Sequence, residues 1–250
     1  MKNLNFIFIL SLNSLVFGQY LEIEYSGMLR QKLSEEDKQD ILEDNEYGRE
    51  QIKMNEEPDS VAYKMLISGK ESSFTYIEKI SNEQDVNKPK IIQSPGGFGT
   101  TYHNLATSES RQDFTIYSKK YYSVDPLEKW DWKIIRESKK MMGYELRKAT
   151  AENQEFTITA WYAPTLNISN GPAQFWGLPG LIFEVEQVAK EYPVQIKYSL
   201  QSIKTLNKAP KIIAPNKGEQ IKISEVEGLY ETANKQLEES YNNPNAVDKD

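Results

Sequence analysis

The chain offers few side chains of the kinds that usually form or break covalent bonds. It has no cysteine and one histidine, His103, so thiol chemistry, zinc–thiolate sites and disulfides are excluded. Any Ser-His-Asp triad would have to use that single imidazole. The G-x-S-x-G and S-x-x-K patterns of common serine hydrolases are absent from the sequence. We expect His103 to lie in a loop and to form hydrogen bonds there rather than to act in catalysis.

Two weaker patterns do not define a reaction either. The glycine-rich segment at 96–101 lacks the lysine of a P-loop and the third glycine of a dinucleotide-binding turn, so we interpret it as part of a loop over 88–110. The 37 acidic residues could supply a carboxylate pair for glycoside hydrolysis, but the linear sequence cannot place two of them at the required separation. They do not follow the order of an EF-hand loop. We predict no catalytic residue, no metal and no cofactor.

Aromatic side chains are a more informative excess, with 15 Tyr and four Trp. They suit both cores and binding surfaces, because Tyr and Trp combine a large apolar ring with a hydrogen-bond donor. Trp130 and Trp132 are two residues apart on an expected strand and should share one face. A candidate ligand or partner surface, with core packing as the alternative, consists of Trp130, Trp132, Trp161, Tyr162 and Trp176.

Alternating apolar residues predict the elements that would position these side chains. Strands are expected at 21–29, 113–118, 130–137, 142–148, 155–162, 181–188 and 194–201, with a hairpin at 61–78 that turns at Gly69 and Lys70. Many short strands joined by turns predict an antiparallel sheet with one buried face. A helix with a capping box at Ser224 should follow and lie across the sheet.

The segment 31–59 has a different character from the rest of the chain. It carries eleven acidic residues against four basic ones. Ser34 is expected to cap a helix that stops at Gly48, but this helix has little apolar surface to bury. We predict a partly helical, solvated insertion in one β-rich domain over 19–240, followed by a flexible tail at 241–250.

The N-terminus has the pattern of an export signal. Lys2 precedes an apolar stretch, and Val16 and Gly18 are suited to signal peptidase, so a signal peptide at 1–18 is expected to be cleaved after Gly18. Polar residues interrupt the stretch, which makes it too short for a spanning helix and predicts no membrane insertion after cleavage. The formal net charge of −7 argues against nucleic acid or an anionic membrane as a partner.

The most specific motif lies between residues 160 and 186. Pro179 and Gly180 occupy the central positions of a type II turn, which requires a positive φ at Gly180. Leu181, Phe183 and Val185 should then enter the core. We predict a structural role for Gly171, Pro172, Gly177, Leu178, Pro179, Gly180, Leu181 and Ile182.

Three segments of the sequence resemble the GLPGLI family of exported Bacteroidota proteins: GPAQFWGLPGLIFEVE at 171–186, GYELRKAT at 143–150 and AWYAP at 160–164. The resemblance implies no particular reaction. It implies a periplasmic, outer-membrane-associated or extracellular location, with an outer-membrane (TonB-dependent) receptor or another envelope protein as partner. A more distant similarity to periplasmic half-barrels implies a mainly β (α+β) fold, in which a curved, half-barrel-like antiparallel sheet wraps a helix.

Three functions are compatible with these observations. The first is an exported, non-enzymatic protein that binds a partner or ligand in an outer-membrane transport or envelope system. The second is a periplasmic carrier that holds a hydrophobic ligand in a concave sheet, which requires an unfilled apolar cavity. The third is an enzyme with an unrecognised carboxylate site or with His103, which requires titratable groups that converge in a cleft.

One further site concerns covalent modification. Asp59-Ser60-Val61 resembles the triplet at which many Bacteroidota attach O-glycans to exported proteins. Ser60 is therefore a candidate glycosylation site, and an unmodified turn residue is the alternative.

Overall fold

The computed structural model describes residues 20–44, 46–78 and 99–242. The strands are β1 (Tyr20–Gln31), β2 (Val61–Ser68), β3 (Glu71–Tyr76), β4 (Thr100–Asn104), β5 (Glu109–Ile116), β6 (Lys119–Pro126), β7 (Lys133–Met141), β8 (Tyr144–Glu152), β9 (Phe156–Ala163), β10 (Leu181–Ala189), β11 (Val194–Thr205) and β12 (Glu219–Ile221). The helices are α1 (Glu35–Asp44), α2 (Gly48–Glu56) and α4 (Val226–Asn242). The expected signal peptide lies outside the described residues, as do residues 243–250 of the expected tail.

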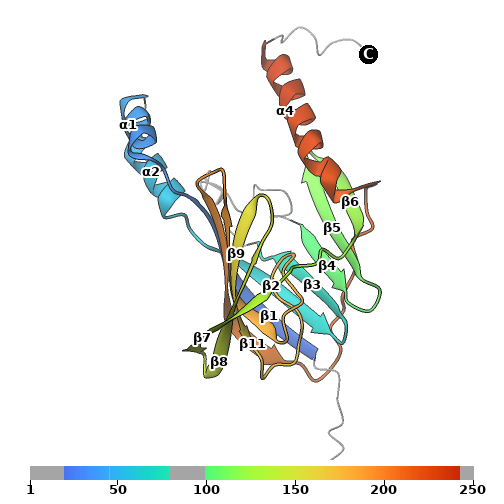
Figure 1. Ribbon diagram of the computed structural model, residues 1–250. Coiled ribbons are helices and arrows are strands. Elements are labelled where there is room, and N and C mark those ends of the chain that lie inside the picture. The colour runs from blue at the N-terminus through green and yellow to red at the C-terminus, as the bar shows by residue number, and fades with distance from the viewer. Residues whose placement is uncertain (1–19, 45, 79–98, 243–250) are drawn as a thin grey trace, which may run out of the picture.

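All twelve strands form one open sheet, which confirms the expected mainly β fold (Figure 1). The strand order is β12-β6-β5-β4-β3-β2-β1-β11-β10-β9-β8-β7. Neighbouring strands pair antiparallel except β12, which runs parallel to β6. The long strand β1 is central because it pairs with β2 along one side and with β11 along the other.

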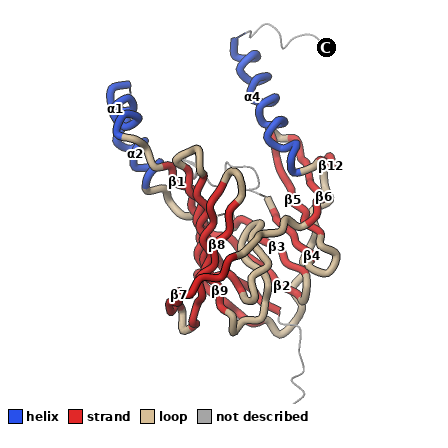
Figure 2. The backbone as a smooth tube through the Cα atoms, viewed as in Figure 1, coloured by secondary structure: helices blue, strands red, loops and turns tan. Residues whose placement is uncertain are grey.

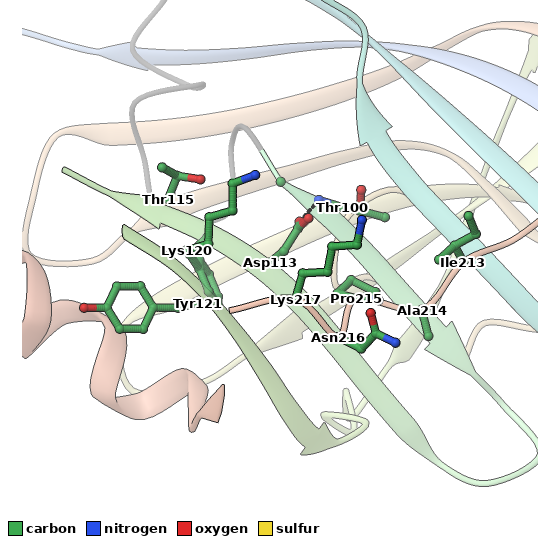
Figure 3. Close-up of a pocket in the computed structure, with 12 residues that line it drawn as sticks. Thr100, Asp113, Thr115, Lys120, Tyr121, Ile213, Ala214, Pro215, Asn216 and Lys217 are labelled. Carbon is green, nitrogen blue, oxygen red and sulfur yellow. Dashed lines mark hydrogen bonds between the residues drawn. The ribbon is translucent and has the colours of Figure 1, made fainter. Parts of the chain in front are cut away.

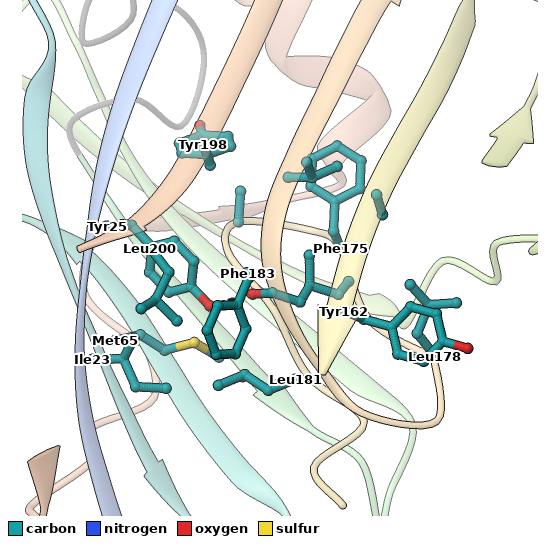
Figure 4. Close-up of a cluster of buried hydrophobic side chains, with 14 of the residues drawn as sticks. Ile23, Tyr25, Met65, Tyr162, Phe175, Leu178, Leu181, Phe183, Tyr198 and Leu200 are labelled. Carbon is teal, nitrogen blue, oxygen red and sulfur yellow. Dashed lines mark hydrogen bonds between the residues drawn. The ribbon is translucent and has the colours of Figure 1, made fainter. Parts of the chain in front are cut away.

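The main core lies on one face of the sheet. Leu21, Ile23 and Tyr25 of β1 alternate with polar residues and are at most 3% exposed, as one-sided burial requires. The 164–180 connection between β9 and β10 adds Phe175 and Leu178 to the same cluster, and Figure 4 shows how the side chains meet. This connection, and not the C-terminal helix, packs against the main core. The carrier hypothesis therefore gains no support from this face.

A second, smaller apolar cluster lies at the β12 end of the sheet. Phe114 and Ile116 of β5 and Tyr121 of β6 pack there against Val226 of α4. The β5–β6 turn contains Tyr117 and Ser118 with φ of 45° and 73°. Such a turn usually contains Asn or Gly, so neither this hairpin nor β6 was expected from the sequence.

The C-terminal helix was predicted correctly but placed wrongly. Its apolar contacts come from Leu229, Tyr230 and Ala233 in its first half, whereas its later residues are mostly exposed. The first half of the helix consequently packs against the β5–β6 hairpin, and the second half projects away from the sheet (Figures 1 and 2). The expected cap at Ser224 is also wrong, because a 3-10 turn (Ile223–Glu225) comes first, and the Lys222 amide donates to the Glu225 carboxylate over 2.7 Å.

The acidic insertion contains two helices instead of the single one expected. The Ser34 cap is confirmed, since the Asp37 amide donates to Ser34 Oγ over 3.0 Å and the Ser34 amide donates back to Asp37 Oδ2 over 3.1 Å. Gly48 does not end the segment but starts α2. A Cβ there would lie 2.6 Å from the Ile41 carbonyl oxygen, so the close approach of the two helices requires glycine.

We predict that this insertion is dispensable for the sheet. Replacing residues 34–58 by a short Gly-Ser linker removes α1 and α2, whose buried residues are few: α2 contributes only Gly48 and Asn55. The expected result is a cooperative thermal transition within about 3 °C of the intact chain, because little apolar area is lost. Circular dichroism at increasing temperature measures the melting temperature and the cooperativity of both proteins. A variant that unfolds without a cooperative transition would show that the helices belong to the core.

Two further expectations about strands need correction. The loop expected at 88–110 contains β4, so His103 lies on a strand; the remainder of that loop before residue 99 is outside the described residues. Trp130 and Trp132 were expected on a strand, but β7 starts after them, at Lys133. Their indoles donate hydrogen bonds to another connection, which holds the chain in an irregular course before the strand begins.

Candidate functional site

The GLPGLI segment lies in the core, but the expected turn geometry at Gly180 is wrong. A positive φ occurs at Gly177, at 97°, and Gly180 is not among the glycines that adopt one. Gly180 is instead required by space, because an added Cβ would lie 2.2 Å from the Ala163 carbonyl oxygen and 2.9 Å from the Cα of Pro164. The motif therefore brings two backbone segments into direct contact.

Hydrogen bonds anchor the residues that follow. Leu181, Ile182 and Phe183 are fully buried. The Ile182 amide donates to the Asn170 carbonyl over 3.0 Å, and the Tyr25 hydroxyl of the central strand donates to the Ile182 carbonyl over 2.6 Å. Gly171 packs against Ile182, with an added Cβ 2.7 Å from the Ile182 Cβ. Pro172 and Leu178 are also buried, whereas Pro179 is exposed.

Three of the candidate tryptophans join two connections. The indole of Trp130 donates to the Gln174 carbonyl over 3.1 Å, and that of Trp132 donates to the Trp176 carbonyl over 2.8 Å. In return, the Trp176 indole donates to the Glu128 carbonyl over 2.6 Å. The segment before β7 is thus fastened to the loop that carries the GLPGLI motif. The indole N–H groups of these three tryptophans therefore donate to backbone carbonyls of the protein and are not directed at a ligand.

The two remaining aromatic candidates point to opposite faces of β9. Tyr162 is 1% exposed in the main core. Trp161 lies on the other face, with the ammonium of Lys139 4.4 Å from its ring centroid and that of Lys148 at 5.9 Å. Lys139 also forms an ion pair with Glu184. The five aromatic candidates therefore do not form one surface.

The single histidine belongs to a buried polar cluster. His103 is 3% exposed and stands opposite Ser72 of β3 and Ser110 of β5. Asn170 donates from Nδ2 to Ser72 Oγ over 2.7 Å and accepts the Gly171 amide over 2.9 Å. Burial lowers the pKa of His103 from 6.5 to about 4, which keeps the imidazole neutral at neutral pH. Its position beneath the sheet surface favours a structural role.

The candidate modification site is placed on the surface. Ser60 is exposed and directly precedes β2. We predict that a share of the protein isolated from its native host carries a glycan there, since a bulky group requires such a position. Mass spectrometry of the peptide that spans Ser60 tests this, with the peptide of Ser81 in the same digest as a control. Only the unmodified mass of the Ser60 peptide at high coverage would contradict the prediction.

A pocket of about 350 Å³ lies next to the β5–β6 hairpin (Figure 3). Thr115 of β5 and Lys120 of β6 are paired across the hairpin, and Asp113 shares their face because it is two residues from Thr115. Phe114 and Tyr121 alternate with them and are buried against α4. One face of the hairpin thus holds the second core and the other faces the pocket, which Phe114 and Tyr121 also border.

The opposite wall is the segment 213–217, which leads into β12. Gly218 has a φ of 108°, and a Cβ there would lie 2.2 Å from the Lys120 carbonyl oxygen. This close approach brings Lys217 beside Lys120, although the two are distant in sequence. In Figure 3 their side chains extend in the same direction on either side of Asp113. This pocket was not expected from the sequence, because a glycine before a short parallel strand is not a specific signal.

The described ranges also bear on metal binding and on membrane crossing. There, no three side chains of His, Cys, Asp or Glu gather as ligands of a metal ion would. In that same part of the chain, each helix is too short or too polar to cross a membrane.

Comparisons with known proteins indicate a family for part of the chain. Residues 107–184 match the family model "Protein of unknown function (Porph_ging)". The matched range includes Gly177 to Ile182, so it is compatible with the GLPGLI resemblance. Among curated proteins, none matches the sequence.

Solved structures show a similar fold. Two crystal structures of PNGF-II, in space groups C2 and P21, are 16% and 17% identical to the chain with TM-scores of 0.51 and 0.53. Each match covers 86% of this chain but only 33% or 34% of PNGF-II, so the chain spans about a third of that protein. A lipoprotein-sorting protein domain from Vibrio parahaemolyticus is 7% identical, with a TM-score of 0.30 over 78% of this chain and 88% of that one. This last value is too low to support an argument about fold.

Proposed function

We propose that this chain is an exported, non-enzymatic binding module that serves an outer-membrane transport or envelope system. The observation that carries the proposal is the pocket between the β5–β6 hairpin and residues 213–217. Its volume of about 350 Å³ lies in the range of small-ligand sites, and half of its twelve described lining residues are polar or charged, so they can fix the orientation of a ligand. The occupant is a small molecule or a short chain end of an envelope partner.

Two features support binding rather than catalysis. His103, the one imidazole, is buried within the sheet, away from the residues that line the pocket. Among the described residues that line the pocket, one carries a carboxylate: Asp113, whose Oδ1 accepts the Thr100 amide. Glycoside hydrolysis uses a pair of carboxylates, which these described residues do not supply. A similar fold also makes up about a third of PNGF-II, which supports its use as one module of a larger assembly.

A pull-down with a pocket-filling variant tests the proposal. Asn216 lines the pocket and is exposed, so Asn216→Trp should fill the space without unfolding the chain. Asn207→Trp is the matched control, because Asn207 is also exposed in the same connection but does not line the pocket. We expect the wild type and Asn207→Trp to retain the same component from the envelope fraction of the native host, and Asn216→Trp to lose it. Equal retention by all three proteins, or none by the wild type, would contradict the proposal.

A further inference from the structure

We infer that the pocket beside the β5–β6 hairpin recognises a carboxylate group on its ligand. The inference rests on the proposed binding function and names the chemistry of the ligand. It is carried by two lysines, Lys120 and Lys217, that line the pocket and form no ion pair with any described residue.

The two lysines differ from the neighbouring Lys119 in having no ion-pair partner among the described residues. Lys119, adjacent in sequence but on the opposite face of β6, pairs with Glu219 over 2.8 Å. Lys120 instead faces the pocket, and the tight passage of Gly218 over its carbonyl places Lys217 on the other wall. Two cations from separate segments are thereby held at one hollow of a chain whose net charge is −7. A bound anion would relieve their mutual repulsion.

The one acidic side chain among the described lining residues does not neutralise both lysines. Asp113 accepts the backbone amide of Thr100 through Oδ1, which fixes the carboxylate toward β4. Neither Lys120 nor Lys217 lies within ion-pair distance of it. Two ammonium groups against one carboxylate leave the described part of the pocket lining with a positive charge, which favours the binding of an anion by the two lysines.

The remaining lining residues limit the rest of the ligand. Asn216 and Thr115 supply neutral hydrogen-bond donors and acceptors beside the lysines. Ile213 is 61% exposed at the rim, and Pro215 is buried beneath it, so an apolar strip continues from the charged part. About 350 Å³ admits a body of the size of one sugar ring or two amino-acid residues. A uronic acid and a peptide C-terminus both present a carboxylate on such a body.

Titration with paired probes tests this inference. D-glucuronate is compared with D-glucose, and N-acetyl-Ala-Ala with its C-terminal amide, with binding followed by nuclear magnetic resonance shifts of the full mature chain. We expect at least one carboxylate probe to bind about tenfold or more tightly than its neutral match, with shifts confined to residues of the pocket, and to weaken as salt is added. The probe with the higher affinity identifies the source of the carboxylate.

Variants connect the effect to the two lysines. Lys120→Gln and Lys217→Gln should each weaken the preferred carboxylate probe about tenfold and leave the neutral probes unchanged. Lys208→Gln, at an exposed position in the same connection outside the pocket, is the control and should bind as the wild type does. Equal affinity for charged and neutral probes, no binding of any probe, or unchanged affinity in both variants would overturn the inference. The proposed function fails separately, if Asn216→Trp retains the envelope component.

Discussion

Gly180→Ala is expected to lower the free energy of unfolding by about 3 kcal/mol, which for a chain of this size corresponds to roughly 6 to 12 °C in melting temperature. The added Cβ would lie 2.2 Å from the Ala163 carbonyl oxygen and 2.7 Å from the carbonyl carbon. Both are backbone atoms of β9, so no side-chain rotation relieves the contact. The strand β10 that follows must move, and it carries Leu181, Ile182 and Phe183, all fully buried.

The choice of replacement separates two explanations for the glycine. If Gly180 were needed for a positive φ, Asn would be tolerated better than Ala, because Asn adopts that conformation more readily. Since the restriction is steric, Gly180→Asn should cost at least as much as Gly180→Ala. The order should reverse at Gly177, whose φ is 97° and where the nearest atom to an added Cβ is 3.6 Å away. There Gly177→Ala should cost about 1 to 2 kcal/mol and Gly177→Asn less.

Gly228→Ala provides the control for these measurements. Gly228 is exposed in α4 with no atom within 4 Å of an added Cβ, so Ala should stabilise the chain by roughly 0.5 to 1 kcal/mol through its higher helix propensity. Chemical denaturation of all five variants gives the comparison. A Gly180→Asn variant clearly more stable than Gly180→Ala would show that backbone conformation, and not space, selects glycine at this position.

The strands of the sheet were predictable where burial of one face makes apolar and polar residues alternate along the sequence. β1, β2, β9 and β11 alternate in sequence, and β10 alternates from Phe183 onward; all five were expected close to their observed bounds. β4 was missed because glycines and prolines precede it, and β6 because its hairpin uses Tyr117 and Ser118 at positive φ in place of Asn-Gly. The order of the strands and the position of α4 depend on contacts between distant segments, which periodicity does not report.

The candidate site was less predictable for a related reason. A tryptophan signals either a core or a binding surface, and only the carbonyls that accept the indole hydrogen bonds of Trp130, Trp132 and Trp176 show that these three join connections. The pocket lysines carry no motif, since Lys120 and Lys217 meet only because β12 returns alongside β6. The sequence therefore shows which side chains are apolar, polar or charged, but only the fold shows which of them lie together.

Acidification is expected to destabilise the protein through its one histidine. Burial lowers the pKa of His103 to about 4 in the folded chain, against 6.5 for an exposed imidazole. Between these values the unfolded chain binds a proton that the folded chain does not, so the free energy of unfolding decreases as the pH falls. The contribution is fully present above pH 6.5 and is lost as the pH falls from 6.5 toward 4. Between pH 7 and pH 5 the loss amounts to about 2 kcal/mol.

His103→Gln isolates this contribution, because an amide does not titrate. Denaturant unfolding of both proteins at pH 7 and pH 5 gives two differences in the free energy of unfolding. Carboxylates that titrate near pH 4 to 5 affect both proteins alike and cancel between them. The wild type should lose about 2 kcal/mol more than His103→Gln over this range, whatever the stability of the variant at pH 7. Equal losses would mean that the imidazole takes up its proton in the folded chain near pH 6.5, and that the polar cluster with Ser72 and Asn170 is open to water.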